Sequence, residues 1–140
     1  MKKYDLCVVG TGPAGYAAAM RAIDFKKSVL LVERDKIGGA GIYNGALSSK
    51  TFWEISKEFA SFSKKINHYG LIPPELNFEN VLLEVNEAIS ERSSQLEEHL
   101  RLVIQKNPEL LDFKKGRACL NGRNIVEIET FEGKESFFAQ

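Results

Sequence analysis

A glycine-rich loop between two short apolar segments is the feature that most constrains the fold of this chain. Residues 10–15 read Gly-Thr-Gly-Pro-Ala-Gly and match the pattern G-x-G-x-x-G. The apolar segment Tyr4–Val9 comes directly before the loop, a run of small residues follows it, and a second apolar segment, Ser28–Glu33, comes next. Strand, loop, helix and strand in this order predict a right-handed β-α-β unit over residues 4–33 whose two strands are parallel.

The loop has the residue types that binding a dinucleotide requires. Gly10 permits the tight turn from strand to helix, Gly12 has no Cβ to block a pyrophosphate, and Gly15 lets the helix pack near the strand. The start of a helix offers unpaired N–H groups and a partial positive charge to the phosphates. Glu33 ends the second strand 23 residues after Gly10, and its carboxylate can accept hydrogen bonds from ribose hydroxyls. The predicted phosphate and ribose contacts are Gly10, Gly12, Pro13, Ala14, Gly15 and Glu33, and they do not by themselves distinguish FAD from NAD.

The rest of the chain predicts two long helices and a set of short strands. A glycine-rich connection over residues 34–49 leads to a helix at about 50–65, and a second helix with Asn77 as its N-cap covers about 78–106. Short β-branched and aromatic segments separated by Asn-Gly and Glu-Gly turns predict a β-meander over residues 111–139. The fold class is therefore predicted as α/β, with a Rossmann-type parallel sheet, in one domain spanning residues 1–140.

Composition excludes several classes of function. Nineteen basic residues balance nineteen acidic ones, so no broad basic field indicates nucleic acid or an anionic membrane as a partner. No signal peptide and no apolar run of membrane-spanning length is present, which favours a cytoplasmic location. Cys7 and Cys119 are predicted as buried, reduced thiols, and no cysteine spacing indicates a metal site.

The segment after the first β-α-β unit carries a resemblance to a known family. Glu33-Arg34, Ile37-Gly38-Gly39 and Leu47-Ser48-Ser49-Lys50 leading into a helix are similar to the N-terminal FAD domain of the dihydrolipoamide dehydrogenase group, the pyridine nucleotide-disulfide oxidoreductases. The resemblance implies FAD as the cofactor, with the pyrophosphate on the first loop, the ribose on Glu33 and the adenine near Gly116 and Ala118. It further implies that the contacts to the cofactor include Arg34, Gly38, Gly39, Gly41 and Lys50, with Lys50 near the flavin. An NAD-binding Rossmann domain would instead continue the alternation of strands and helices.

The chain departs from the family pattern at the redox centre. The family's Cys-x4-Cys pair falls on Gly41 and Ala46, and neither residue can carry a thiol. One explanation is an oxidoreductase that moves hydride between a nicotinamide and FAD and passes the electrons to another acceptor. The family's soluble transhydrogenases favour this explanation, because their cysteine pair departs from the family pattern in a similar way. A second is a non-catalytic paralogue that keeps the fold as a binding or interaction module, with the apolar face of helix 78–106 as a surface for a partner. Deliberate replacement of the cysteines is a third.

The family's remaining domains do not fit within 140 residues. We therefore expect the sequence to be the N-terminal part of a longer protein, whose other domains would bind NAD(P)H and form a homodimer. We expect this chain alone to be inactive and to hold FAD weakly. His68 and His99 match no catalytic histidine of the family and are predicted to lie on the surface.

Overall fold

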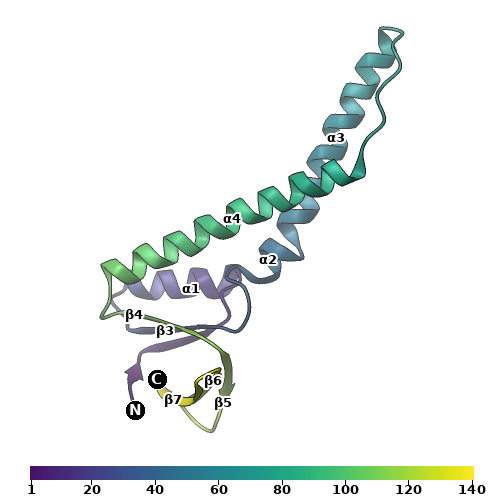
Figure 1. The fold of residues 1–140 in the computed structure, drawn as a ribbon. Helices are drawn as coiled ribbons and strands as arrows, with labels where there is room; N and C mark the ends of the chain where they lie inside the picture. Colours follow the sequence, from purple (N-terminus) through teal and green to yellow (C-terminus); the bar gives the residue numbers. More distant parts are fainter. The chain divides into compact units, whose positions relative to one another are not determined.

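The structure is a computed structural model that describes residues 1–140 (Figure 1). It divides the chain into two compact units. The first unit consists of Met1–Gly39 and Ser94–Gln140, and the second unit consists of Ala40–Ser93.

A three-stranded parallel sheet forms the centre of the first unit. Its strands are β2 (Leu6–Val9), β3 (Val29–Glu33) and β4 (Leu111–Lys115), in the order β2-β3-β4. Helix α1 (Pro13–Asp24) connects β2 to β3, which confirms the predicted parallel β-α-β unit. Assigning 111–115 to the meander was wrong, because this segment pairs in parallel with the free edge of β3 and leaves only three strands for the meander.

A second sheet of four strands contains the meander. Its strands are β1 (Lys3–Tyr4), β5 (Arg117–Leu120), β6 (Ile125–Thr130) and β7 (Gly133–Ala139), in the order β1-β7-β6-β5. The strands β5, β6 and β7 are antiparallel neighbours, and β1 lies parallel to β7.

The single strand predicted at 4–9 is divided at Asp5 into β1 and β2, which belong to different sheets. The carboxylate of Asp5 accepts hydrogen bonds from the N–H and the hydroxyl of Ser28, at 2.7 and 2.8 Å, and the Asp5 N–H donates to the Ser28 carbonyl. These bonds hold the bend at which the chain changes sheets.

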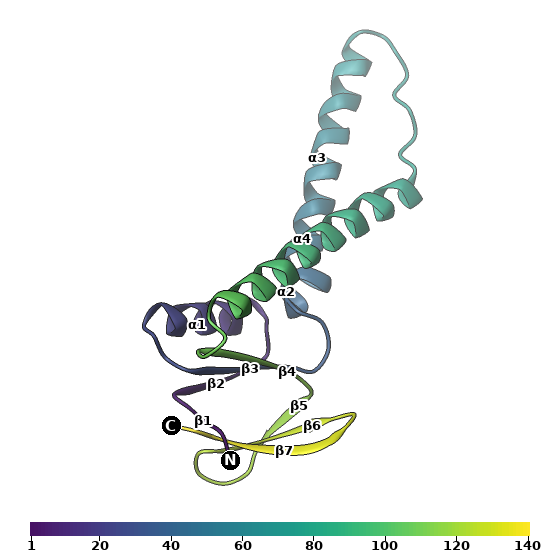
Figure 2. The same cartoon turned by 60° about the vertical axis from the view of Figure 1, so that its left-hand side comes forward.

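Alternate side chains of β3 enter two different cores of the first unit. Val29 and Leu31 pack with Ala19 and Ile23 of α1 and with Leu100 of α4, the helix Phe78–Lys106. On the other face of the sheet, Leu30 and Val32 pack against the second sheet, together with the group Tyr4, Val126, Ile128 and Phe137. The first unit therefore has three layers. They are α1 with the last part of α4, the parallel sheet, and the second sheet (Figures 1 and 2). Since the central strand is buried on both faces, it is apolar without alternation.

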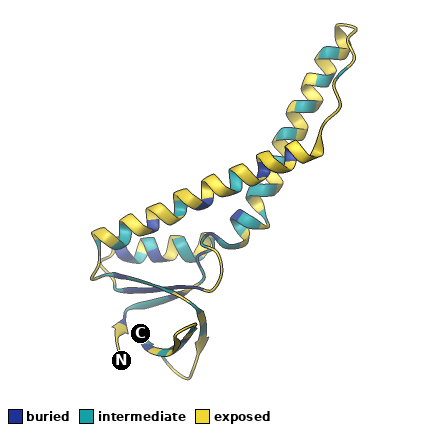
Figure 3. Cartoon of the chain, in the orientation of Figure 1, coloured by how far each residue is buried: buried dark blue, intermediate teal, exposed yellow.

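The second unit is helical and contains α2 (Gly39–Tyr43) from its second residue onward, α3 (Ala46–His68) and the first half of α4. The predicted connection 34–49 therefore includes a short helix and the first turn of α3, which extends beyond its predicted range of about 50–65 at both ends. Asn77 caps α4 as predicted, since its Oδ1 accepts the Glu79 N–H at 2.9 Å. No residue of α3 is fully buried, and exposed residues dominate this helix (Figure 3). None of the helices combines the length and hydropathy of a membrane span.

Candidate functional site

The glycine loop follows the carboxyl end of β2 and leads directly into α1. The Gly10 N–H donates to the Val32 carbonyl at 2.7 Å, which fixes the start of the loop beside β3. Gly10 has φ +97°, a conformation that favours glycine. A Cβ on Gly15 would lie 2.1 Å from the Gly10 carbonyl oxygen, so the third glycine is required for the helix to lie this close to the loop. Pro13 begins the helix, where its missing N–H leaves no hydrogen bond unmade.

Gly12 differs from Gly15 in what surrounds it. Its backbone has φ −61° and ψ 174°, which other residues adopt readily, and a Cβ built on it would meet no atom within 4 Å. Nothing within the chain therefore requires glycine at this position. Open space beside the N-terminus of a helix fits a phosphate group that approaches the backbone closely. In this respect the loop fits the pyrophosphate of a dinucleotide.

Thr11 and Glu33 join the loop to the end of β3. The carboxylate oxygen Oε2 of Glu33 accepts the Thr11 N–H at 2.8 Å and the Thr11 hydroxyl at 2.7 Å, while Oε1 accepts the Asp35 N–H at 2.9 Å. The Gly38 N–H donates to both Thr11 oxygens at 3.2 Å. Thr11 is fully buried. This role of Thr11 is not predicted by the sequence pattern, because the middle position of a G-x-G motif accepts many residue types.

Glu33 is ionised although it is only 8% exposed. Burial alone would raise the pKa of this carboxyl group. Hydrogen bonds from the backbone of Asp35, from Thr11 and from the backbone of Arg34 outweigh that effect and lower the pKa below its ordinary value. The oxygen Oε2 already accepts two hydrogen bonds from Thr11, whereas Oε1 accepts one from the Asp35 N–H, so Oε1 is the oxygen that can accept a ribose hydroxyl.

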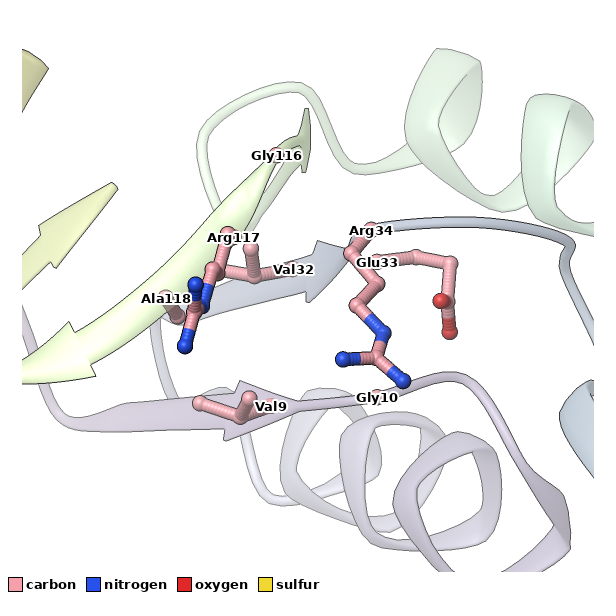
Figure 4. A pocket seen from close by; sticks show the side chains of 8 residues that line it. All are labelled: Val9, Gly10, Val32, Glu33, Arg34, Gly116, Arg117 and Ala118. Carbon is pink, nitrogen blue, oxygen red and sulfur yellow. The ribbon is translucent and has the colours of Figure 1, made fainter. Parts of the chain in front are cut away.

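The loop, the end of β3 and the start of β5 enclose a pocket of about 240 Å³ (Figure 4). Its lining residues are Val9, Gly10, Val32, Glu33, Arg34, Gly116, Arg117 and Ala118. The fold thus brings Gly116 and Ala118, which the resemblance assigned to the adenine, to the predicted ribose residue about 80 positions earlier in the sequence. Arg117 was missed, since no sequence pattern indicated that its side chain faces this pocket.

The other predicted residues lie at two places. Gly38 and Gly39 belong to the first unit and have positive φ, and a Cβ on Gly39 would lie 3.3 Å from the Gly12 Cα, so this turn also lies against the loop. Gly41 in α2, and Ala46 and Lys50 in α3, belong to the second unit.

The cysteines and histidines form no cluster of functional groups. Cys7 is half-buried and Cys119 is exposed, so the prediction of burial was wrong for Cys119, and both thiols are free. His68 and His99 are exposed, as predicted, and His99 Nδ1 lies 2.5 Å from the hydroxyl of Tyr16. No group of three or more His, Cys, Asp or Glu side chains is placed to hold a metal ion.

Comparison with known proteins gives the same assignment as the loop and the pocket. The family model described as pyridine nucleotide-disulphide oxidoreductase matches residues 4–139. The chain is 30% identical to dihydrolipoyl dehydrogenase 3 of Pseudomonas putida over 139 residues, which cover 97% of this chain and 28% of that protein. It is 29% identical to the soluble pyridine nucleotide transhydrogenase of a Marinomonas species, over 94% of this chain and 27% of the relative.

A solved structure has the same fold. The HOCl-induced flavoprotein disulfide reductase RclA of Escherichia coli, in its Cu(II) complex, superposes with a TM-score of 0.76 at 18% identity, over 99% of this chain and 27% of that one. The chain spans just over a quarter of the length of these relatives. The match to the family model extends over nearly every residue, and the chain therefore belongs to the pyridine nucleotide-disulphide oxidoreductase family, with the fold of its N-terminal FAD-binding domain.

Proposed function

We propose that the first unit binds the ADP half of FAD and that the whole protein transfers hydride between a nicotinamide and this flavin. The observation that carries the proposal is the meeting of three features at one edge of the parallel sheet. These features are the open space beside Gly12, the ionised Glu33, and the pocket that reaches Gly116 and Ala118. Ligands of open α/β sheets bind at this edge, beyond the carboxyl ends of the strands.

The residues of the loop supply the contacts that a pyrophosphate needs. The first turn of α1 contributes the backbone N–H groups of Ala14 and Gly15, which precede the first intrahelical hydrogen bond, that from Tyr16 to Gly12. The helix has no acidic residue in this turn to repel an anion. Glu33 would bind a hydroxyl of the adenosine ribose, and its negative charge disfavours a 2′-phosphate on that ribose.

The flavin half is proposed from the family resemblance. Gly38 and Gly39 have no side chains to fill the side of the loop on which the flavin is proposed to lie. Gly41 and Lys50 are proposed to face the flavin. Bound FAD supplies the group that accepts or donates hydride. Lys50 would stabilise the negative charge that develops on the reduced flavin, because a cation placed beforehand lowers the energy of that charge.

Electrons cannot leave this flavin through a disulfide at the family's position. Gly41 and Ala46 have no thiol, and burial raises the pKa of the Cys7 thiol, which lowers its reactivity. We therefore propose that the whole protein passes its electrons to a different acceptor, a second nicotinamide or a small oxidant. The likeness to a relative named as a transhydrogenase supports this proposal. We also propose that the whole protein is a cytoplasmic homodimer.

The same two residues favour a second candidate, a paralogue that binds FAD without catalysis. The two candidates differ in a measurement on the protein in its full length. The oxidoreductase candidate predicts flavin absorbance near ~450 nm together with oxidation of NADH or NADPH when an artificial acceptor is added. Bound flavin without nicotinamide oxidation would support the non-catalytic candidate, and failure to take up FAD at all would contradict both. Reduction of a disulfide substrate would contradict the absence of a thiol relay.

A further inference from the structure

Two arginines line the proposed adenine pocket without a partner in the chain. Arg34 follows β3 and Arg117 begins β5, and both side chains point toward the end of β2 (Figure 4). Both residues are exposed. Neither guanidinium takes part in an ion pair or hydrogen bond of the structure. The pocket therefore holds two cationic, planar groups that are available to a ligand.

The acidic residue of the pocket does not neutralise them. The Glu33 carboxylate is directed to Thr11 and to the Asp35 N–H, and Figure 4 shows it turned away from both guanidinium groups. Arg34 is adjacent to Glu33 in the sequence, yet the two side chains form no ion pair. The hydrogen bonds of Glu33 thus leave Arg34 without the nearest counterion.

The walls of the pocket suit a flat apolar surface better than an anion. Val9 is 58% exposed although it is a strand residue with an apolar side chain, and it faces the pocket. Val32 and Ala118 add apolar surface, and Gly116 adds no side chain. The volume of about 240 Å³ lies below that of sites for whole small ligands, about 300–1,000 Å³. It suits one part of a ligand, such as a purine ring.

We propose that Arg34 and Arg117 are positioning residues that stack their guanidinium planes on the adenine of the cofactor. This inference rests on the proposed function, which places the ADP half of FAD at this site. Guanidinium planes stack on aromatic faces and on nucleic-acid bases, and the weak hydration of the group favours such contacts. A phosphate bound between the two arginines would instead lie against the apolar side chains of Val9, Val32 and Ala118. The two arginines therefore set a preference for the base.

The test is calorimetric titration of ADP into the 140-residue chain and into Arg34→Ala and Arg117→Ala. Stacking of a cation on a ring contributes about 0.5–2 kcal/mol, so each alanine should weaken ADP binding by about two- to thirty-fold. Arg123→Ala is the matched control, because Arg123 is exposed, lies outside the pocket and should leave the affinity unchanged. Circular dichroism verifies that each variant keeps the wild-type fold.

Lysine variants separate stacking from charge. Arg34→Lys and Arg117→Lys keep the positive charge and lose the planar guanidinium group, so we expect them to bind ADP as weakly as the alanine variants. We expect this loss of ADP affinity to change little between low and high salt. Wild-type affinity in the lysine variants, together with tighter binding of 2′,5′-ADP than of ADP, would overturn the proposal in favour of a phosphate site. Unchanged ADP binding in both alanine variants would also overturn it and leave the proposed function intact. A wild-type chain that binds neither ADP nor FAD would refute the proposed function, and this inference with it.

Discussion

Substitution of two glycines in the same loop should separate folding from ligand binding. A Cβ on Gly15 would lie 2.1 Å from the Gly10 carbonyl oxygen, whereas Cβ contacts below 3.0 Å essentially do not occur, so helix and loop must move apart by about 0.9 Å. Overpacking of this size costs about 1–3 kcal/mol. We therefore predict that Gly15→Ala lowers the melting temperature of the chain by about 3–10 °C.

For Gly12→Ala we predict the opposite result, with the stability of the chain kept and ligand binding weakened. The new Cβ meets no protein atom, and φ −61° is allowed for alanine. Alanine is a poorer N-cap than glycine, but it also restricts the unfolded chain, and the two effects are of similar size, each about 0.5–1 kcal/mol. The melting temperature should therefore change little. Binding of ADP or FAD should fall at least about tenfold, because the methyl group occupies the space of the pyrophosphate.

Thermal unfolding followed by circular dichroism and titration calorimetry measure the two quantities on the same samples. The reasoning is refuted if Gly12→Ala binds ADP as tightly as the wild type, since the open space beside this residue would then not hold the ligand. It is equally refuted if Gly15→Ala is as stable as the wild type.

Three further predictions concern the first unit. Thr11→Val should lower the free energy of unfolding by about 1–3 kcal/mol in urea denaturation, because it removes the hydroxyl that donates to buried Glu33 at 2.7 Å; equal stability would show that this bond is dispensable. The pKa of Glu33 in the folded chain lies below the value of about 4.3 in the unfolded chain. The ionised carboxylate therefore stabilises the folded state above about pH 4.3, and this stabilisation is lost as the pH falls through the folded pKa. The stability difference between the wild type and Glu33→Gln should therefore shrink between pH 6 and about pH 3, and a difference independent of pH would contradict this. Leu30→Ala, at a fully buried position between the two sheets, should cost about 2–5 kcal/mol, and a loss below about 1 kcal/mol would indicate that the layers are not packed as described.

The parallel β-α-β unit and the helix over 78–106 could be predicted because their signals are local. The glycine pattern, Pro13 at the first helical position and the Asn77 cap each act within a few residues of the element that they determine. The need for glycine at position 15 is also local, since it comes from the close approach to the Gly10 carbonyl oxygen in the same loop.

The partners of the strands could not be predicted, because strand pairing is decided by residues distant in sequence. The segment 111–115 has the length and composition of a meander strand, but the long crossover through α4 returns it to the free edge of β3. Asp5 divides the first strand through a hydrogen bond to Ser28, a contact that no periodic pattern displays. The place of Arg117 in the pocket could not be predicted for the same reason, because the other residues that line the pocket lie more than 80 positions earlier in the sequence, apart from its neighbours Gly116 and Ala118.

The most direct test of the central proposal is a comparison of FAD, ADP and FMN as ligands of the 140-residue chain by titration calorimetry. If the first unit binds the ADP half of the cofactor, ADP and FAD should bind saturably, and ADP should displace FAD. FMN, which has no adenosine, should not compete with ADP. Binding of FMN with no binding of ADP would contradict the assignment of the glycine loop and its pocket to the adenine dinucleotide.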